Sequence, residues 1–382
     1  MSVLTSVPPP QQATLQSVLS PISLRSGRDN AVDLVKGTAC LLMVAAHVHF
    51  AHAEWVQRAT MAAVLFFAST GMNLVSIVER REGQENRLAL NAVFLIFAGF
   101  ADNYVQGTLG DCDVFQSAGM AILAMLALRR ILPRFWTWLF PVPFFIHLAN
   151  QQFHCRVTAG GIWSFFLTPG LFPLLPWLSF YLLGAHLKKH EGLRQGWHIG
   201  TAALFSLAIL DLFRPFQFRK FWMSPDYFLI GVALTGWSFA ALHRWLGERD
   251  AARLIEIRRW GANSLVFYIL SNFVIRVLEM ALPHGVGFLL LSLASTAVLL
   301  RPALALQAWA TRRPPGTVMM TGGLTALAVL AVNSLLWPHS FYLHTLSSFG
   351  LTFSFVACYP AWKNISRAVA GRSRRALEVS MS

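Results

Sequence analysis

Long apolar stretches follow one another along most of the chain, with short polar segments between them. Each is close to the ~20 residues that a helix needs to cross the hydrocarbon core of a bilayer. The pattern predicts an all-α polytopic membrane protein with about 11–12 transmembrane helices. The predicted spans lie approximately at 31–50, 57–78, 87–107, 114–131, 134–150, 168–187, 196–213, 226–246, 260–281, 284–308, 317–336 and 341–361. The Pro-rich stretch 134–150 and the stretch 341–361 fit least well.

Composition narrows the class further. Charged residues make up 13% of the chain and hydrophobic residues 55%, with a mean hydropathy of +0.52. Soluble domains carry about 25% charged residues. A soluble, a disordered and a disulfide-stapled secreted protein are therefore excluded. The net charge of +14 does not indicate nucleic-acid binding, because the basic residues lie between apolar runs and not on one face. The spacing of Cys and His predicts no metal site.

The basic residues predict the orientation. With both termini cytoplasmic, 25 of the 31 Lys and Arg residues fall inside, as the positive-inside rule requires. We therefore expect a multi-pass protein of the plasma membrane, which in a bacterium is the inner membrane, in contact with membrane lipid. Residues 1–27 are predicted to form a flexible cytoplasmic tail, 28–362 the membrane domain and 363–382 a basic cytoplasmic tail. The six basic residues outside are Arg58, Arg156, Arg214, Arg219, Lys220 and Arg276.

Titratable residues gather on the opposite side. Eight of the twelve histidines fall on the outer half, together with Asp102, Asp111 and Asp113. Charged and imidazole groups are costly in lipid, so those at membrane depth should face a water-filled cavity. The sequence predicts a basic inner mouth and an outer cavity rich in titratable groups. The eight histidines are His47, His49, His52, His147, His154, His284, His339 and His344.

The first predicted span carries a polar stripe. Asp33, Lys36, Cys40, Met43 and His47 follow one another at steps of 3, 4, 3 and 4, which places them on one helical face. Lys36 and His47 should lie ~16 Å apart along the axis, at about 1.5 Å per residue. They would line one tunnel through the bilayer. Alternatively, Asp33 and Lys36 snorkel at the interface, and His47 is an ordinary core histidine.

This span and the segment after it resemble the opening signature of the transmembrane acyltransferase superfamily, which includes the acyltransferase-three and the heparan-alpha-glucosaminide N-acetyltransferase families. The signature reads R-x4-D-x2-K-G-x9-H followed by H-A-x-W. Lys36 stands where the family usually has Arg, and the acidic residue that often follows H-A-x-W is replaced by apolar residues. The matching residues are Arg28, Asp33, Lys36, Gly37, His47, His52 and Trp55.

Further segments resemble the same superfamily, in the same order along the chain. Ser117 replaces an Arg of the family pattern, and the His that often closes the fourth of these segments is missing. The segments are VLFFASTGMNL (64–74), DVFQSAGMAIL (113–123), FPLLPWLSFYLLGAHL (172–187) and WGANSLVFYIL (260–270), together with Arg214 and MSPDYFLIG (223–231).

The resemblance implies an acyltransferase domain over 28–362. It would move an acyl group, acetyl in our interpretation, from cytosolic acyl-CoA through the bilayer to a hydroxyl or amine of a sugar or glycan acceptor on the outer face. Acetyl-CoA is then a co-substrate, and no bound cofactor is expected. His52, or His47 in the acyltransferase-three pattern, would act as general base or transient acyl carrier.

The remaining site residues divide between donor and acceptor. Those expected at the donor are Lys36, Asp33, Arg28, Asn263 and Ser264. Those expected at the acceptor are Trp55, Asn103, Gln116 and Arg276. For the Asn, Gln and Ser residues the alternative is polar contact between helices, and Arg276 could instead neutralise Glu279 at i,i+3.

Other interpretations remain open. Twelve spans also suit a secondary transporter, although the two halves show no convincing repeat. A catalytically silent membrane relative that acts as a binding partner is a third class. The sequence does not decide between a monomer and a homodimer. Cys112 and Cys155 both fall in outer loops, where a disulfide is plausible.

Overall fold

The computed structural model describes residues 29–48, 61–80, 83–152, 161–167, 171–190, 193–220, 222–245, 254–336 and 341–381. Within these ranges the chain is helical and contains no β-strand, so the predicted all-α class is confirmed there. The helices are α2 (Asn30–His47), α4 (Ala62–Arg80), α5 (Glu85–Gln106), α6 (Val114–Ile131), η1 (Trp136–Leu139), α7 (Val142–Gln152), η2 (Gly161–Phe165), α8 (Leu174–Lys189), α9 (Leu193–Phe213), α10 (Pro225–Trp245), α12 (Ile255–Ala262), α13 (Ser264–Glu279), α14 (Val286–Arg312), α15 (Pro315–Leu336) and α16 (Phe341–Met381).

Six of these helices, α4, α5, α6, α9, α14 and α15, are long and apolar enough to cross a membrane. The pair α12 and α13, bent by 92°, makes a seventh if it is counted as one span. The structure therefore supports a membrane protein with several spanning helices. In the predicted span 134–150 it places η1 and the 11-residue α7, and an 11-residue helix is only about 16 Å long, too short to cross alone.

One end of the bundle is basic. Lys188 Nζ at the end of α8 lies 2.7 Å from Asp29 Oδ2 at the start of α2, and Arg129 at the end of α6 pairs with Glu85 at the start of α5. The indole of Trp362 in α16 also reaches the first turns of α5. We call this the basic end; its described basic residues include Arg129, Arg130, Lys188, Lys189, Arg258, Arg259, Arg312, Arg313, Lys363 and Arg367.

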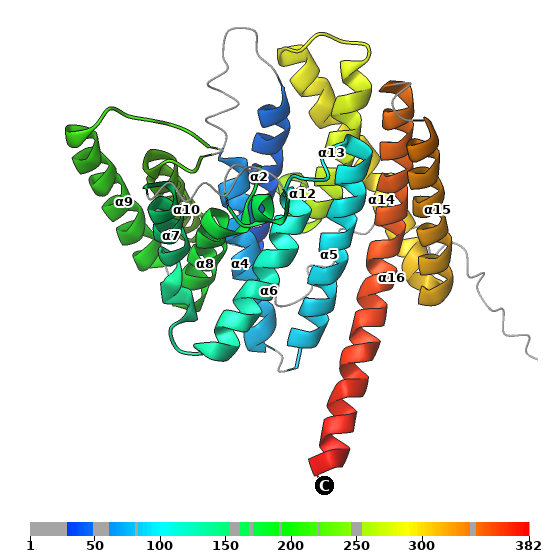
Figure 1. Cartoon of the computed structure of the whole chain (residues 1–382), viewed down its shortest axis with the longest axis horizontal. Helices are drawn as coiled ribbons and strands as arrows, with labels where there is room; N and C mark the ends of the chain where they lie inside the picture. The colour runs from blue at the N-terminus through cyan, green and yellow to red at the C-terminus, as the bar shows by residue number, and fades with distance from the viewer. Residues whose placement is uncertain are drawn as a thin grey trace, which may run out of the picture.

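The opposite end is where α5 and α13 finish and where α6, α8 and α16 begin (Figure 1). There the Phe172 N–H donates to the Cys112 carbonyl at 2.9 Å, and Arg276 Nη1 donates to Ser348 Oγ at 2.8 Å. We call this the acidic end, after Asp102, Asp111, Asp113 and Glu279. Among the described residues, the basic residues predicted for the inner side and the acidic residues predicted for the outer side lie at opposite ends. The positive-inside rule predicts that the basic end faces the cytoplasm.

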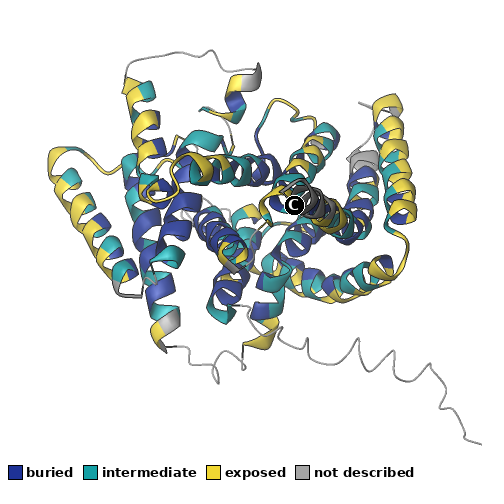
Figure 2. Cartoon of the chain, turned by 90° about the horizontal axis from the view of Figure 1, so that it is seen from below, coloured by how far each residue is buried: buried dark blue, intermediate teal, exposed yellow. Residues whose placement is uncertain are grey.

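Burial is concentrated in the middle of the bundle (Figure 2). In α4, 67% of the apolar window is buried inside the protein, against 17% in α9 and in α15. In Figure 1, α9 and α15 lie at opposite sides of the bundle. Large apolar side chains such as Leu212 and Leu335 point outward from them. Lipid tails would cover such side chains at little cost, so the peripheral helices fit a bilayer environment.

The helices α4 and α8 pack closely on one another in the core. A Cβ added to Gly71 of α4 would overlap the Tyr181 carbonyl, and one added to Gly184 of α8 would overlap the Ala68 carbonyl. The ring of Phe67 stacks on that of Tyr181, with centroids 4.6 Å apart. The two glycines therefore let the helix backbones touch, as small residues do in membrane helices.

The last helix extends beyond the bundle. α16 has 41 residues, and Figure 1 shows its C-terminal part projecting past the basic end. The predicted boundary at 362/363 is not a break in the backbone, because α16 continues through it to Met381. Lys363 Nζ lies 3.9 Å from the ring centroid of Tyr359, one turn earlier. The predicted basic tail is thus, over its described part, a continuation of the last helix.

Candidate functional site

The predicted stripe on α2 is buried over its first turns and opens at its end. Asp33 and Lys36 are buried near the basic end, although both are charged types that rarely occur in cores. Lys36 Nζ lies 5.9 Å from the ring centroid of Phe66 on α4. Cys40 is buried, and His47 is exposed at the far end of the helix. The burial of Asp33 and Lys36 favours a site over simple snorkelling.

His47 is oriented by its own helix. Its Nδ1 lies 2.8 Å from the Met43 carbonyl oxygen. Because a carbonyl only accepts, Nδ1 carries the hydrogen, and Nε2 is the basic nitrogen of the neutral ring. In this tautomer Nε2 is the nitrogen that can take up a proton. The predicted role of His47 stays a prediction.

The motif glycines of α2 and α12 bring two distant segments together. A Cβ on Gly37 would overlap the Ile257 carbonyl, and one on Gly261 would overlap the Asp33 carbonyl. The side chain of Arg258 in α12 also donates to Asn30 at the start of α2. Gly37 and Gly261 are 224 positions apart in the chain, and the two segments that contain them pack backbone to backbone.

Asn263 occupies the break between α12 and α13. Its Nδ2 donates to the Arg259 carbonyl at 2.9 Å, and its backbone N–H donates to the same carbonyl at 3.2 Å. Ser264, the first residue of α13, is buried. The structure thus gives Asn263 a local role at the bend, and the predicted contact of Asn263 and Ser264 with the donor stays a prediction.

Asn103 and Gln116 hold the turn between α5 and α6. Gly107, with φ of 71°, ends α5, and Asn103 Nδ2 donates to the Asp111 carbonyl at 2.6 Å. Gln116 Oε1 accepts from the Asp113 N–H at 3.2 Å, while its buried Nε2 finds no acceptor among the described residues. The structure gives both side chains a local role, and their predicted contact with the acceptor stays a prediction.

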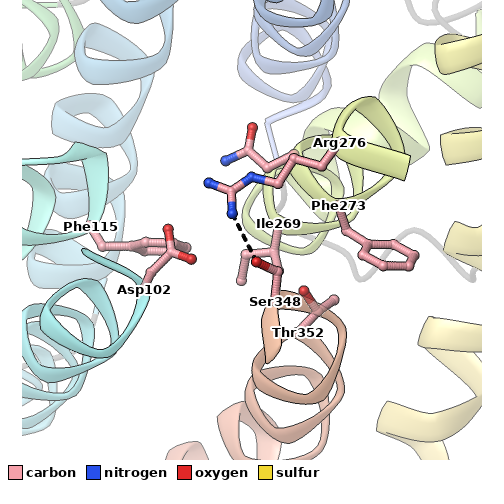
Figure 3. A pocket seen from close by; sticks show the side chains of 8 residues that line it. Asp102, Phe115, Ile269, Phe273, Arg276, Ser348 and Thr352 are labelled. Carbon is pink, nitrogen blue, oxygen red and sulfur yellow. Dashed lines mark hydrogen bonds between the residues drawn. The ribbon is translucent and has the colours of Figure 1, made fainter. Parts of the chain in front are cut away.

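A small cleft opens at the acidic end, between α5, α6, α13 and α16. It has about 270 Å³ of empty space, counting its open mouth. Figure 3 shows Arg276 reaching into it from α13 and Asp102 facing the guanidinium group from α5. Arg276 does not pair with Glu279, which lies instead 3.6 Å from His284 Nε2, so the mutual-neutralisation alternative is wrong. The cleft is lined by Asp102, Phe115, Ile269, Asn272, Phe273, Arg276, Ser348 and Thr352.

Asp113 lies next to this cleft, at the start of α6. The Tyr268 hydroxyl donates to both of its carboxylate oxygens, at 3.3 and 3.2 Å. Burial raises the pKa of Asp113, and the Tyr268 hydroxyl and the nearby Arg276 charge counteract this only in part, while Asp111 adds to it. A buried carboxyl with a raised pKa favours its protonated form in the folded state.

This shift predicts a pH dependence of stability. As pH rises above 3.8, the ordinary pKa of Asp, the unfolded state loses this proton first and the folded state loses relative stability until its own pKa is passed. We expect Asp113→Asn to remove that loss, because asparagine still suits the N-cap position. The measurement is the difference in thermal midpoint between variant and wild type from pH 4.5 to 7.5. A difference that does not grow with pH would contradict the raised pKa.

Sequence reasoning missed most of the cleft. Asn272 and Arg276 stand at i,i+4 on α13, and Ser348 and Thr352 stand at i,i+4 on α16, so each pair shares one face. These polar pairs, each on one helix face, were the available signal. Which helix faces meet at the cleft could not be read from the chain.

Several predicted residues lie outside the described residues: Arg28, His52, Trp55 and Cys155. Cys112 is described as a buried thiol whose Sγ lies 3.8 Å from the Asp113 carbonyl oxygen. The disulfide with Cys155 stays a prediction.

Comparison with protein-family models, curated proteins and solved structures finds no match for this chain. The fold by itself defines an all-helical protein with several membrane-spanning helices over the described residues.

Proposed function

We propose that the protein is an integral membrane acyltransferase. It moves an acyl (acetyl) group from cytosolic acyl-CoA to a hydroxyl or amine of a sugar or glycan acceptor on the outer face. The chain crosses the bilayer about 11–12 times, with both termini in the cytoplasm of a plasma membrane. The proposal rests on one observation: segments that resemble the superfamily pack on one another in the core.

The contacts between these segments are direct. The segment with Gly37 packs on the segment with Gly261, and the segment with Gly71 packs on the one with Gly184. Arg214 Nη2 pairs with Asp226 Oδ1 of the SPDYFLIG segment at 2.7 Å. Contact between these segments is what a shared site would require, because residues distant in the chain must meet there.

The basic end suits the donor. Coenzyme A carries phosphates, and a concentration of Lys and Arg raises the local density of an anionic substrate. Lys36, buried on α2 beside Phe66, is the cation proposed to hold the donor, with Asp33 one turn earlier and Arg28 before the helix. The bend at Asn263 and Ser264 packs close to this region through Gly261.

The chemistry requires an imidazole at the acceptor. The neutral ring removes the proton as the acceptor oxygen or nitrogen attacks the thioester carbonyl. The C–S bond then breaks, and the imidazolium returns the proton to the departing coenzyme A thiolate. His52 is the first candidate and His47 the second; formation of an acyl-histidine is the alternative route. Val48 and Met61, which flank the segment containing His52, follow α2 and precede α4 at the acidic end.

Replacing Lys36 tests the donor site. We expect Lys36→Ala to raise KM for acetyl-CoA by about 10- to 100-fold, because one charge-assisted hydrogen bond is lost. Lys36→Arg should keep most of the affinity, since the superfamily pattern has Arg at this position. The measurement is release of free thiol from acetyl-CoA by detergent-purified protein, as a function of acetyl-CoA concentration.

Lys189→Ala is the matched control, because Lys189 also lies at the basic end but outside the motif. Equal KM values for wild type and Lys36→Ala would remove Lys36 from the donor site. Complete absence of turnover in the wild type with every acceptor tested would favour the silent relative. Uptake of a solute by reconstituted vesicles without turnover would favour a transporter.

A further inference from the structure

The part of the chain that forms α14, α15 and most of α16 carries an unbalanced positive charge. Residues 280–377 contain eight Lys and Arg residues and no Asp or Glu. The rest of the chain carries 23 basic and 17 acidic residues. The basic residues of these three helices therefore have no carboxylate within their own segment to pair with.

Four of the eight basic residues form a patch at the basic end. Buried Ala310, Val318 and Ala361 contact one another, which brings the end of α14, the start of α15 and the middle of α16 to one level. The four basic side chains follow these contacts within two to six residues along α14 and α16, and all are exposed or half-buried. We call them the cationic patch: Arg312, Arg313, Lys363 and Arg367.

The cationic patch lacks a partner of opposite charge within the part of the chain that the structure describes. Elsewhere at the basic end the protein supplies such partners, since Glu85 pairs with Arg129 and Asp29 pairs with Lys188. No ion pair joins the cationic patch to a described residue. An anion that pairs with the patch must therefore come from outside the described chain.

Trp309 indicates the depth of the patch in the membrane. Its side chain is 50% exposed near the end of α14, and the Arg313 guanidinium carbon lies 5.4 Å from its ring centroid. Exposed tryptophans near the ends of spanning helices are typical of the headgroup level of a bilayer. The cation–π contact holds the Arg313 guanidinium at the same level. The patch therefore lies where lipid phosphates are found.

Apolar surface continues from the patch along the bundle. Figure 1 shows α14, α15 and α16 together at one side of the protein. Only 17% of the apolar window of α15 is buried, and its Met320 and Leu324 are exposed, as is Val298 of α14. Lipid tails cover such side chains at little cost. A ligand that carries acyl chains as well as an anionic group would contact both surfaces, whereas a soluble anion would contact only the patch.

We propose that the cationic patch binds the phosphate of an anionic phospholipid, whose acyl chains lie along the exposed faces of α14 and α15. The planar donors of Arg312 and Arg313 match phosphate oxygens, and Lys363 and Arg367 add positive charge from α16. The positive-inside rule places this end at the cytoplasmic leaflet, where anionic lipids attract basic segments. The binding requires neither the donor nor the acceptor of the proposed function.

Native mass spectrometry of the detergent-purified full chain tests the proposal. The probes are dioleoyl phosphatidylglycerol and dioleoyl phosphatidylcholine, which have the same chains but differ in headgroup charge. We expect the first phosphatidylglycerol to bind at least about tenfold more tightly, and less so at high salt. Arg312→Gln/Arg313→Gln should weaken it by about 10- to 30-fold and leave phosphatidylcholine unchanged. Arg367→Gln should weaken it by about fivefold.

The matched control is Arg130→Gln/Arg134→Gln, which removes two exposed arginines from the same end of the bundle but outside the patch. It should keep the affinity of the first phosphatidylglycerol within about twofold, and thermal midpoints should show that all variants fold. Equal affinities for the two lipids, wild-type binding in Arg312→Gln/Arg313→Gln, or an equal loss in both double variants would overturn the proposal. Displacement of the lipid by inorganic phosphate alone would assign the patch to a soluble anion and would also overturn it.

Discussion

Acyl transfer by His52→Ala is expected to fall by about 10²- to 10⁴-fold, the share of rate that a positioned general base contributes. The superfamily resemblance makes His52 the first candidate for the general base. The structure gives His47 a ring already oriented through Nδ1 to the Met43 carbonyl. We therefore expect the loss in His52→Ala, with His47→Ala retaining most of the rate; the reverse result would make His47 the base. The measurement is thiol release from acetyl-CoA at saturating donor.

A matched control separates chemistry from folding. His284, another histidine at the acidic end, lies 3.6 Å from Glu279 and outside the motif, so His284→Ala should retain wild-type turnover. Thermal midpoints of all three variants show whether a loss is structural. Wild-type turnover in both His47→Ala and His52→Ala would remove the imidazole from the mechanism.

The second large effect concerns the α4–α8 contact. Replacing Gly184 with valine should destabilise the bundle by about 1–3 kcal/mol or more, because the new side chain would overlap the Ala68 carbonyl and force two core helices apart. Gly71→Val should act in the same way on the Tyr181 carbonyl. The measurement is the midpoint of thermal unfolding in detergent, followed by loss of the monodisperse peak in gel filtration.

The control is a helical glycine that, unlike Gly184, has open space around it. A Cβ on Gly323 of α15 would meet no atom within 4 Å, so Gly323→Val should change the midpoint little. If Gly184→Val were as stable as Gly323→Val, the close approach of α4 and α8 would not exist in solution. Because the effect is steric, Gly184→Ala should give a smaller loss than Gly184→Val.

Much of the fold could be predicted from the sequence because hydropathy is a local property. Apolar runs gave α4, α5, α6, α9, α14 and α15 close to their observed bounds, and the spread of Lys and Arg separated the two ends. The helix break at Asn263 and the short α7 were not predicted. Both depend on which neighbours satisfy the backbone, and hydropathy does not report that.

The site was predicted unevenly for the same reason. Helical spacing placed Asp33 and Lys36 on one face, and the structure buries both. Spacing could not show that His47 is exposed or that Asn103 bonds to the Asp111 carbonyl. Those outcomes depend on residues distant in the chain or on the path of a loop.

The sequence by itself determined that this is a helical membrane protein with a basic and an acidic side. Each of those properties depends only on the residue types within individual segments. A spanning segment must be apolar over its own length, and the charges that flank it set its orientation. Only the tertiary structure decided that Gly37 meets Gly261, that Gly71 and Gly184 join α4 to α8, and that Asp102 faces Arg276. These contacts join segments far apart in the chain, and they arise from which helix faces fit together.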